Sequence, residues 1–570
     1  MIIPSSFLQK PILVLMLMVF SLVCAPRSAQ GLRPLSEPSK SPQDREPQFQ
    51  PQGNATLETP DQIKEELGIP PLEVYVKRIE VKGSTVFSPK TLEEITAPYT
   101  HRYVTTEDLE ELRIDVTKTY QRKGFINSGA VIPDQDISNA TIQVHIVEGE
   151  LSRVDVTNNR WFRDAFFQKR IQSAATKPLN IHALQNALQL LQLKEQIKQI
   201  RARLKPGLEP GQSILEMEVF EKKPLELEVS IDNHQSPSVG GERGQVSLSN
   251  NNLLGWGDTL SLTYGRSEGL DPEVDAWYAL PLTVNDLTAT WRYRQNDFSV
   301  IEAPFDELDV ESESRAFSFS LRRPVLKDLH QELALSLELE YQENETFLLD
   351  MPFSFSPGAE DGRSQVTALR FGQEWTHRST RQVLALSSRL SLGVDLFGAT
   401  VHPDRPDGQF LAWLGQAQYA RILGETDIQA LARLDIQLAS DSLLPLEQVA
   451  VGGRYSVRGY RENELVRDNG LTASLETRIP IFRDALLADS LFLAPFFDYG
   501  RGWNQDRPTP SLKDLYSVGI GLIWTWTPLQ SHPEFETYGE IYWGIPLKDV
   551  DNPDDDLQDD GLHFMLTVNY

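Results

Sequence analysis

The chain has 570 residues, which is more than one ordinary domain holds, so two or more domains are expected. Its formal net charge is −27, from 81 acidic and 54 basic residues, and this excludes a basic nucleic-acid-binding surface over the chain as a whole. The single cysteine, Cys24, lies close to the N-terminus, so neither a disulfide nor a cysteine metal site is available further along the chain.

The N-terminus has the pattern of a secretory signal peptide. Lys10 precedes an apolar run that is too short to cross a bilayer as a helix, and Gly31 ends a small-x-small cleavage site. Cys24 could instead be a lipoprotein cysteine, although Val23 is bulky for that signal. We predict a signal peptide over residues 1–31 and export from the cytoplasm.

A linker is predicted over residues 32–71. Pro, Gln, Ser and Glu dominate this segment and leave little to bury. Residues 61–67 could form a short helix within it.

Two consecutive units, residues 72–148 and 149–223, are predicted to have the same β-α-α-β-β order. Ser88 is an N-cap with Pro at the next position, and Asn180 caps a helix in the second unit. Recurring order and spacing indicate an internal repeat, which we favour over one larger α+β domain. The predicted strands cover residues 74–83, 126–132, 141–147, 151–157, 197–207 and 213–223, and the helices cover residues 89–96, 105–124, 161–171 and 181–193.

From residue 224 to residue 570 the hydrophobic pattern alternates with period two, which is typical of strands with two different faces. Sixteen such runs are found, and they begin near residues 225, 243, 258, 273, 287, 314, 331, 365, 384, 410, 428, 470, 490, 515, 535 and 560.

The length of each connection depends on whether the run before it has an odd or an even number. The very long ones follow odd-numbered runs, whereas those after even-numbered runs, such as residues 253–257 and 423–426, are short. A soluble β-sandwich gives no reason for this difference, but an outer-membrane barrel has long loops outside and tight turns in the periplasm. An even strand number also closes the sheet without a free edge in lipid. We therefore predict a 16-stranded antiparallel transmembrane β-barrel. The long connections cover residues 296–314, 342–364, 439–469 and 499–513.

Aromatic residues at the strand ends are predicted to form the girdles of the barrel at the membrane surfaces. These residues are Trp277, Tyr278, Trp291, Tyr293, Trp524, Trp526, Tyr542 and Trp543.

The segment VGGRYSVRGYR, residues 451–461, lies in the longest of these connections. Parity makes this connection extracellular, but residues 443–469 are long enough to fold back into the barrel lumen. An Arg in a Gly-rich loop is usually solvated surface. Asp498, however, lies on the strand face opposite two aromatic residues, so it faces the lumen if they face lipid, and Glu476 is placed in the same way. We expect Arg458 to pair with Asp498, with Glu476 as a second candidate.

The order of these parts resembles the outer-membrane transporters of two-partner secretion, the hemolysin-activator and hemagglutinin-secretion family. YVKRIEVKGSTVFS and TYQRKGF resemble its POTRA (polypeptide-transport-associated) modules, and NNNLLGWGDTLSL, VRGY and FFDYG resemble barrel signatures. The resemblance implies a lumen-loop motif of Val457, Arg458, Gly459 and Tyr460, with Asp498 and Glu476 as lumen carboxylates. It also implies a C-terminal strand, with Phe564 and Tyr570, read by the barrel-assembly machinery, although Phe is commoner than Tyr at the last position. A helix near the N-terminus can plug such pores, but residues 32–71 are too Pro-rich for a long one.

The function implied by this resemblance is export of one large, β-rich exoprotein across the outer membrane, with the modules in the periplasm. We expect the modules to capture an unfolded segment by strand addition, after which the substrate threads the lumen and folds outside. The alternatives are an insertion factor for other outer-membrane proteins and a diffusion porin. Two modules rather than a longer string favour export, and a porin needs no modules.

Motifs of enzymes are absent from the sequence. There is no HExxH, GxSxG or Walker-type glycine loop, and the nine His are scattered, so we predict no enzyme activity, no cofactor and no metal site. The acidic segments 306–313 and 549–560 either bind cations that bridge to lipopolysaccharide or are solvated loops. The expected partners are the exoprotein, outer-membrane lipid with lipopolysaccharide, and the assembly machinery, with no nucleic acid.

Overall fold

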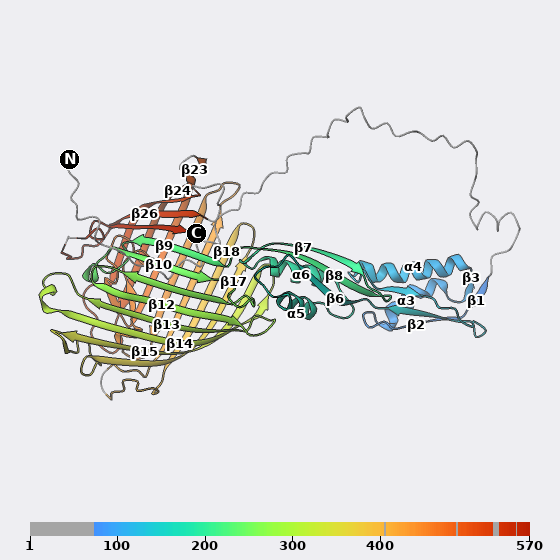
Figure 1. Cartoon of the computed structure of the whole chain (residues 1–570), viewed down its shortest axis with the longest axis horizontal. Coiled ribbons are helices and arrows are strands. Elements are labelled where there is room, and N and C mark those ends of the chain that lie inside the picture. Colours follow the sequence, from blue (N-terminus) through green and yellow to red (C-terminus); the bar gives the residue numbers. More distant parts are fainter. Residues whose placement is uncertain (1–72, 404–405, 486–487, 528–534, 554–555) are drawn as a thin grey trace, which may run out of the picture.

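The structure is a computed structural model that describes residues 73–403, 406–485, 488–527, 535–553 and 556–570. The predicted signal peptide, the linker and the helix at residues 61–67 lie outside the described residues. Two α/β modules extend from one end of a closed barrel (Figure 1). In the described part of the chain, no helix has the length and apolar character needed to cross a membrane.

The first module has a three-stranded sheet in the order β2-β5-β4, with β2 parallel and β4 antiparallel to β5. One face of α4 packs on this sheet through the buried Leu112, Val116 and Tyr120. Ser88 caps α3 through the amide of Thr91, as its position before a Pro predicts. The elements are β1 (Val74–Val76), β2 (Arg78–Lys82), α3 (Pro89–Thr96), η2 (Ala97–Tyr99), β3 (Arg102–Val104), α4 (Thr106–Arg122), β4 (Gly129–Val131) and β5 (Thr141–Val147).

The strand predicted over residues 74–83 is two strands. The amides of Lys77 and Arg78 both donate to the carbonyl of Ala140, at 2.8 and 3.2 Å, and this contact interrupts the ladder. Before it, β1 pairs with β3, a strand that the periodicity did not predict. The prediction of a single strand was wrong because two tertiary hydrogen bonds divide a continuous apolar alternation.

The second module repeats the order of the first. Its sheet is β6-β8-β7, with β6 parallel and β7 antiparallel to the central β8. Helix α5 begins at Asp164 and not at Trp161, because the Glu221 carboxylate accepts the amides of residues 160–162 and holds that turn outside the helix. The elements are β6 (Glu150–Thr157), α5 (Asp164–Ala174), α6 (Ile181–Gln192), β7 (Ile197–Pro206) and β8 (Gln212–Glu221).

The barrel has sixteen antiparallel strands, which confirms the predicted number and fold class. It closes between β27 and β9, from Met565 opposite Asp232 to Asn569 opposite Glu228. The first residue of each predicted run lies within four residues of the first residue of an observed strand. The strands are β9 (Leu225–Asp232), β10 (Arg243–Asn250), β11 (Thr259–Arg266), β12 (Leu270–Pro281), β13 (Thr288–Ser299), β14 (Val310–Lys327), β15 (Gln331–Leu348), β17 (Arg363–Arg378), β18 (Gln382–Gly393), β19 (Leu411–Ile422), β20 (Gln429–Ala439), β23 (Asn469–Ala485), β24 (Ala488–Trp503), β25 (Asp514–Trp526), β26 (Glu536–Pro546) and β27 (Leu562–Asn569).

The connections of the barrel also hold short elements. The hairpin strand β16 (Met351–Pro352) pairs with the end of β15. Two further strands, β21 (Val449–Val451) and β22 (Leu465–Arg467), pair with each other outside the barrel ladder. The 3-10 turns are η3 (Pro237–Val239), η4 (Asp306–Leu308) and η5 (Pro445–Glu447).

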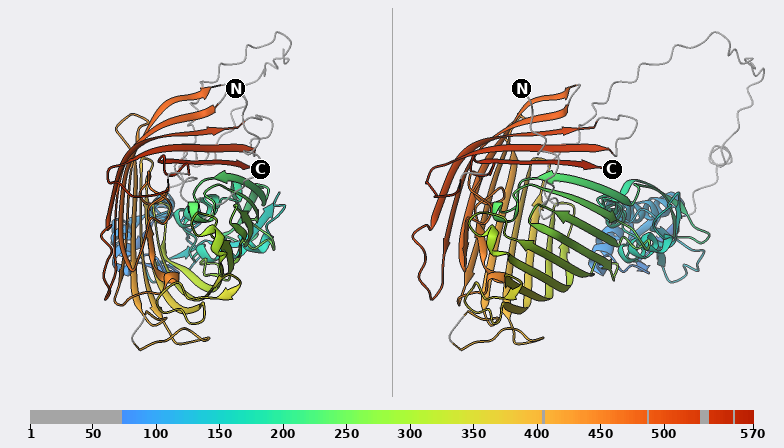
Figure 2. Two further views of the ribbon diagram at one scale, coloured as in Figure 1. Left: turned by 90° about the vertical axis from the view of Figure 1, so that its left-hand side faces the viewer. Right: turned by 60° about the vertical axis from the view of Figure 1, so that its left-hand side comes forward.

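The second module is fixed to the periplasmic turns of the barrel. Arg163 donates from its backbone amide and its guanidinium to carbonyls of turn 251–258, at 3.1 and 2.9 Å. Arg170 pairs with Asp286 of turn 282–287 at 3.1 Å. Figure 2 shows the modules beside the first, green strands of the barrel. The long loops therefore lie at the opposite, extracellular end.

Candidate functional site

The connection between β20 and β23, residues 440–468, folds into the barrel lumen. Its tip contacts inward-facing side chains of the wall, and Val451, Val457 and Tyr460 pack in a buried cluster with Leu515 of β25. The pair β21–β22 forms the stem of this loop. We call residues 440–468 the lumen loop.

Arg458 lies against Asp498 of β24. The guanidinium donates from Nε to Oδ2 at 2.7 Å and from Nη2 to Oδ1 at 2.9 Å, so the contact is bidentate. The backbone amide of Arg458 also donates to Oδ2, at 3.1 Å. Asp498 is 0 % exposed, whereas its neighbour Phe497 is 44 % exposed, so the two side chains face the lumen and the lipid respectively. The carboxylate therefore holds both the side chain and the backbone of the loop tip.

Glu476 of β23 completes the surroundings of Arg458. Its Oε2 accepts from Arg458 Nη1 at 2.5 Å and from the Tyr542 hydroxyl at 3.2 Å, while its Oε1 accepts from Arg478 Nε at 2.8 Å. The guanidinium carbon also lies 3.6 Å from the ring centroid of Phe496. The structure thus brings both predicted carboxylates to the same cation, together with two aromatic rings that the sequence did not indicate.

Gly459 and Tyr460 fix the turn that follows Arg458. Gly459 has φ +89° and its amide donates to His563 Nε2 at 3.1 Å. A Cβ at this position would lie 2.8 Å from the carbonyl carbon of Gly544, so a side chain has no room. The Tyr460 hydroxyl donates to the carbonyl of Tyr516 at 2.9 Å.

Two more arginines anchor the lumen loop, one on the wall and one on neighbouring connections, and the sequence analysis did not single them out. Arg454 pairs with Glu540 of β26 at 2.7 Å. Arg461 pairs with Asp559 and with Glu302, both at 2.5 Å, and so joins the lumen loop to two extracellular connections. The segment VGGRYSVRGYR has Arg at positions 454, 458 and 461. This repeated Arg was the signal in the sequence that could have indicated all three contacts.

The base of the lumen loop has an anchor of its own on β15 and β17, which β18, β19 and β20 separate from β23. Glu447 accepts from Arg370 of β17 at 2.6 Å, and Arg370 also contacts Glu340 of β15 at 2.7 Å. All three side chains are buried or nearly so. The lumen loop therefore spans the inner side of the wall from β15 and β17, past β18 to β20, to β23 and β24.

The predicted aromatic girdle was wrong at two positions. Tyr542 is fully buried in the lumen beside Arg458, and Trp277 lies on the same, inward face of β12 as Asp275, which bonds Arg292. Adjacent strand residues face opposite sides, so both members of Trp277–Tyr278 or of Tyr542–Trp543 cannot face lipid.

The C-terminal strand β27 lies at the closure of the barrel. The amide of Phe564 donates to Asn233 Oδ1 at 2.7 Å, and the amide of Tyr570 donates to the carbonyl of Leu227 at 2.8 Å. Tyr570 is exposed, with Lys223 over its ring. Across the described parts of the chain, no group of three or more His, Cys, Asp or Glu could hold a metal ion.

The β7 edge is a second candidate site. Strand β7 pairs with β8, and among the described residues no other strand pairs with it. The Gln192 side chain covers the start of the free edge: it accepts from the amide of Ile200 at 2.7 Å and donates to the carbonyl of Lys198 at 3.0 Å. Backbone groups of alternate residues point to the same side, so Ala202 and Leu204 also present their amides to this edge.

Comparison with known proteins agrees with this geometry. The family model described as haemolysin secretion/activation protein ShlB/FhaC/HecB matches residues 211–523, and a ShlB-type POTRA domain model matches residues 74–149. The outer membrane transporter CdiB of Dickeya dadantii (strain 3937) is 24% identical over 461 residues, which cover 78% of this chain and 79% of that protein.

Two solved structures share the fold. CdiB from Escherichia coli superposes with a TM-score of 0.65 at 21% identity and covers 92% of this chain and 93% of its own. BamA from Haemophilus ducreyi, lacking POTRA domains 1–3, gives a TM-score of 0.52 at 13% identity over 88% of this chain and 100% of its own. The chain belongs to the ShlB/FhaC/HecB family, the outer-membrane transporters of two-partner secretion, with its POTRA modules in the periplasm.

Proposed function

We propose that this transporter captures an extended segment of its partner exoprotein on the free edge of β7 and conducts it through the lumen, and that Arg458 sets the position of the lumen loop along this route. The observation that carries the proposal is the double contact of Arg458 with Asp498 and Glu476. These two carboxylates belong to neighbouring strands of the wall, so one cation aligns the loop tip with both.

The lumen loop and the barrel wall are held by different interactions. The wall is closed by its own ladder of backbone hydrogen bonds. The loop is held by ion pairs and side-chain hydrogen bonds, which can be exchanged one at a time for contacts with water or substrate, and by the apolar cluster around Leu515. The loop can therefore shift during transport without opening the wall to lipid.

The β7 edge suits an extended polypeptide. Strand addition uses backbone donors and acceptors, so it tolerates many sequences, as capture of an unfolded segment requires. Gln192 occupies the edge positions at Lys198 and Ile200, and the next amide that points to this edge is that of Ala202. We infer that the captured strand starts its pairing there.

Transport on this proposal involves no catalytic step. Binding to the modules and folding of the exoprotein outside supply the free energy, because the periplasm has no ATP. Partners beyond the exoprotein are outer-membrane lipid with lipopolysaccharide, and the assembly machinery that reads β27 with Phe564 and Tyr570.

The test of function is a strain that lacks this chain. We expect the partner exoprotein to disappear from the medium and to return with the wild-type chain, while the levels of unrelated outer-membrane barrels stay unchanged. Loss of several unrelated barrels, with normal export of the exoprotein that remains, would instead support an assembly factor.

A further inference from the structure

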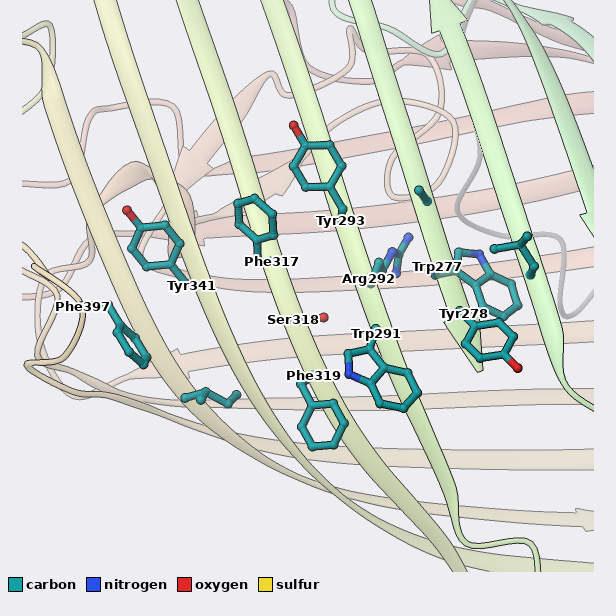
Figure 3. Close-up of a pocket in the computed structure, with 13 residues that line it drawn as sticks. Trp277, Tyr278, Trp291, Arg292, Tyr293, Phe317, Ser318, Phe319, Tyr341 and Phe397 are labelled. Atoms are coloured by element: carbon teal, nitrogen blue, oxygen red, sulfur yellow. The ribbon is translucent and has the colours of Figure 1, made fainter. Parts of the chain in front are cut away.

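An apolar hollow of about 570 Å³ lies on the lipid-facing side of β11 to β15 (Figure 3). Two rows of side chains that are neighbours in the strand register form most of it. The upper row is Tyr293, Phe317 and Tyr341, and the row beneath it is Trp291, Phe319 and Leu339. Figure 3 shows the aromatic rings of both rows on one side of the sheet.

The extracellular limit of the hollow is marked by a sharp change in polarity. The next row on the same face is Gln295, Arg315 and Glu343. The hydroxyls of Tyr293 and Tyr341 reach up to it, donating to Gln295 at 2.8 Å and to Glu343 at 2.9 Å. The upper aromatic row is thus the last apolar row before charged side chains begin. The hollow lies directly beneath the head-group level, in the outer leaflet.

Phe397 projects over the rim of the hollow from the loop between β18 and β19. Its side chain is 67 % exposed, and its φ of +56° lies in a region that aromatic residues rarely adopt. The backbone around it is fixed, since the Thr367 hydroxyl donates to the carbonyl of Leu396 at 2.8 Å. A strained backbone that holds an apolar ring outward, on the lipid side, indicates that something apolar covers the ring.

The hollow has a small side chain among large ones. Ala276 lies opposite Tyr293 and leaves a depression beside it, while the rings of Tyr293 and Phe317 pack 4.8 Å apart and those of Trp291 and Phe319 5.4 Å apart. Its volume falls in the range of about 300–1,000 Å³ found for small-molecule sites. Rigid rings around a depression bind a chain with less loss of entropy than a flexible wall does.

We propose that this hollow binds one acyl chain of an outer-leaflet lipid, whose head group lies against the row of Gln295, Arg315 and Glu343. An acyl chain fits because the lining is almost entirely hydrocarbon and faces the membrane interior. The chain enters beneath the ring of Phe397. It stays bound in the hollow, whereas lipid on the rest of the wall exchanges freely.

The test counts the lipids retained by the full chain after detergent extraction, by native mass spectrometry, with palmitoyl-oleoyl phosphatidylethanolamine or lipid A added in separate arms. We expect the wild type to retain one molecule in at least one arm, and that arm identifies the head group. Ala276→Phe fills the depression and should lower retention roughly tenfold, the effect of losing a few buried methylenes. Phe397→Gly keeps the left-handed backbone but removes the ring, so it should lower retention as well.

The matched control is Ala432→Phe, on the lipid-facing side of β20 two residues from the exposed Leu434. It should retain lipid as the wild type does, and heat-modifiable gel migration should show all three variants folded. Equal retention by the wild type, Ala276→Phe and Ala432→Phe would overturn the proposal, because the lipid would then belong to the general annulus. A dimer of the chain that only Ala276→Phe abolishes would also overturn it, by assigning the face to a second copy.

Discussion

Arg458 carries its charge where little water reaches it. Its side chain is 3 % exposed, and Asp498, Glu476, the Ser474 hydroxyl and the Phe496 ring surround the guanidinium. Removing one partner of such a group leaves an uncompensated charge, which costs about 3–5 kcal/mol when water is excluded. The pairing is therefore more than the surface contact that an Arg in a Gly-rich loop usually makes.

Arg458→Ala and Asp498→Ala are each expected to lower export roughly tenfold or more, while the protein stays inserted and heat-modifiable, because the barrel ladder does not depend on this contact. Arg458→Lys should restore export only in part, since an ammonium cannot make the planar bidentate contact. The measurements are export of the exoprotein and surface proteolysis of residues 440–468.

The control for this charge removal is Arg266→Ala. Arg266 pairs with Asp271 at 3.2 Å on the exposed outer wall, where an ion pair contributes little. The Arg266→Ala variant should export the exoprotein as the wild type does. Normal export by both Arg458→Ala and Asp498→Ala would show that the contact does not organise the channel.

Gly459→Ala tests the close approach of the loop tip to the wall. Alanine at φ +89° is strained by about 1–2 kcal/mol, and its Cβ would also collide with Gly544. Gly424→Ala provides the same kind of strain, at φ +57°, in a turn with nothing within 4 Å of the new atom. We expect Gly459→Ala to impair export and expose the loop to protease, and Gly424→Ala to do neither. Equal effects would mean that backbone strain alone, and not the approach to Gly544, limits this position.

At the scale of single elements, the sequence predicted whatever depends on local alternation. The starts of the barrel strands follow from period-two runs, and the N-caps Ser88 and Asn180 follow from side chains that satisfy helix amides. The start of α5 and the split at Lys77 depend on Glu221 and Ala140, which are distant in sequence, and no local pattern contains them.

The lumen site was predictable for a similar reason. Strand alternation placed Asp498 and Glu476 on the inward face, so their meeting with Arg458 required only that the loop fold inward. The contacts of Arg461 with Asp559 and Glu302 join three connections whose paths are set by the closed barrel. The alternation of residues in the strands gives no information about the course of these connections.

The β7 edge yields a prediction about one element. Ala202→Pro removes an amide that points to the free edge, whereas Arg203→Pro removes one that points to β8. We expect Ala202→Pro to weaken binding of an extended exoprotein segment to the full transporter in detergent without disturbing the module, and Gln192→Ala to leave binding intact. Binding is measured by fluorescence anisotropy of a labelled segment, and module folding by hydrogen exchange of β8. Unchanged binding by a folded Ala202→Pro variant would exclude strand addition at this edge.

At the scale of the whole molecule, the joint between the second module and the barrel sets where the β7 edge lies relative to the barrel, and so matters for the proposed route of the substrate. Asp286 of turn 282–287 is the centre of this joint. It accepts from Arg170 of α5 at 3.1 Å and from Lys327 of β14 at 2.9 Å, and Lys194 lies 3.5 Å away. One carboxylate thus links a module helix, a segment after α6 and a barrel strand.

The pH dependence of this joint follows from the charge of Asp286. Burial alone would raise the pKa of Asp286, but Lys194, Lys327 and Arg170 outweigh burial and hold it well below its usual range. A carboxylate with a lowered pKa in the folded state stabilises that state above its unfolded pKa of about 3.9 and loses the contribution as the pH falls toward the folded value. The contribution of Asp286 to the joint should therefore be insensitive to pH between about 5 and 8 and weaken only below about pH 4. Asp286→Asn removes the charge at every pH and should loosen the joint at pH 7, whereas Glu425→Gln neutralises a carboxylate of another periplasmic turn and should not. Distances between spin labels on the second module and on the barrel measure this, and their distribution should broaden for Asp286→Asn. A narrow, wild-type distribution for that variant would show that turn 251–258 holds the module without this charge.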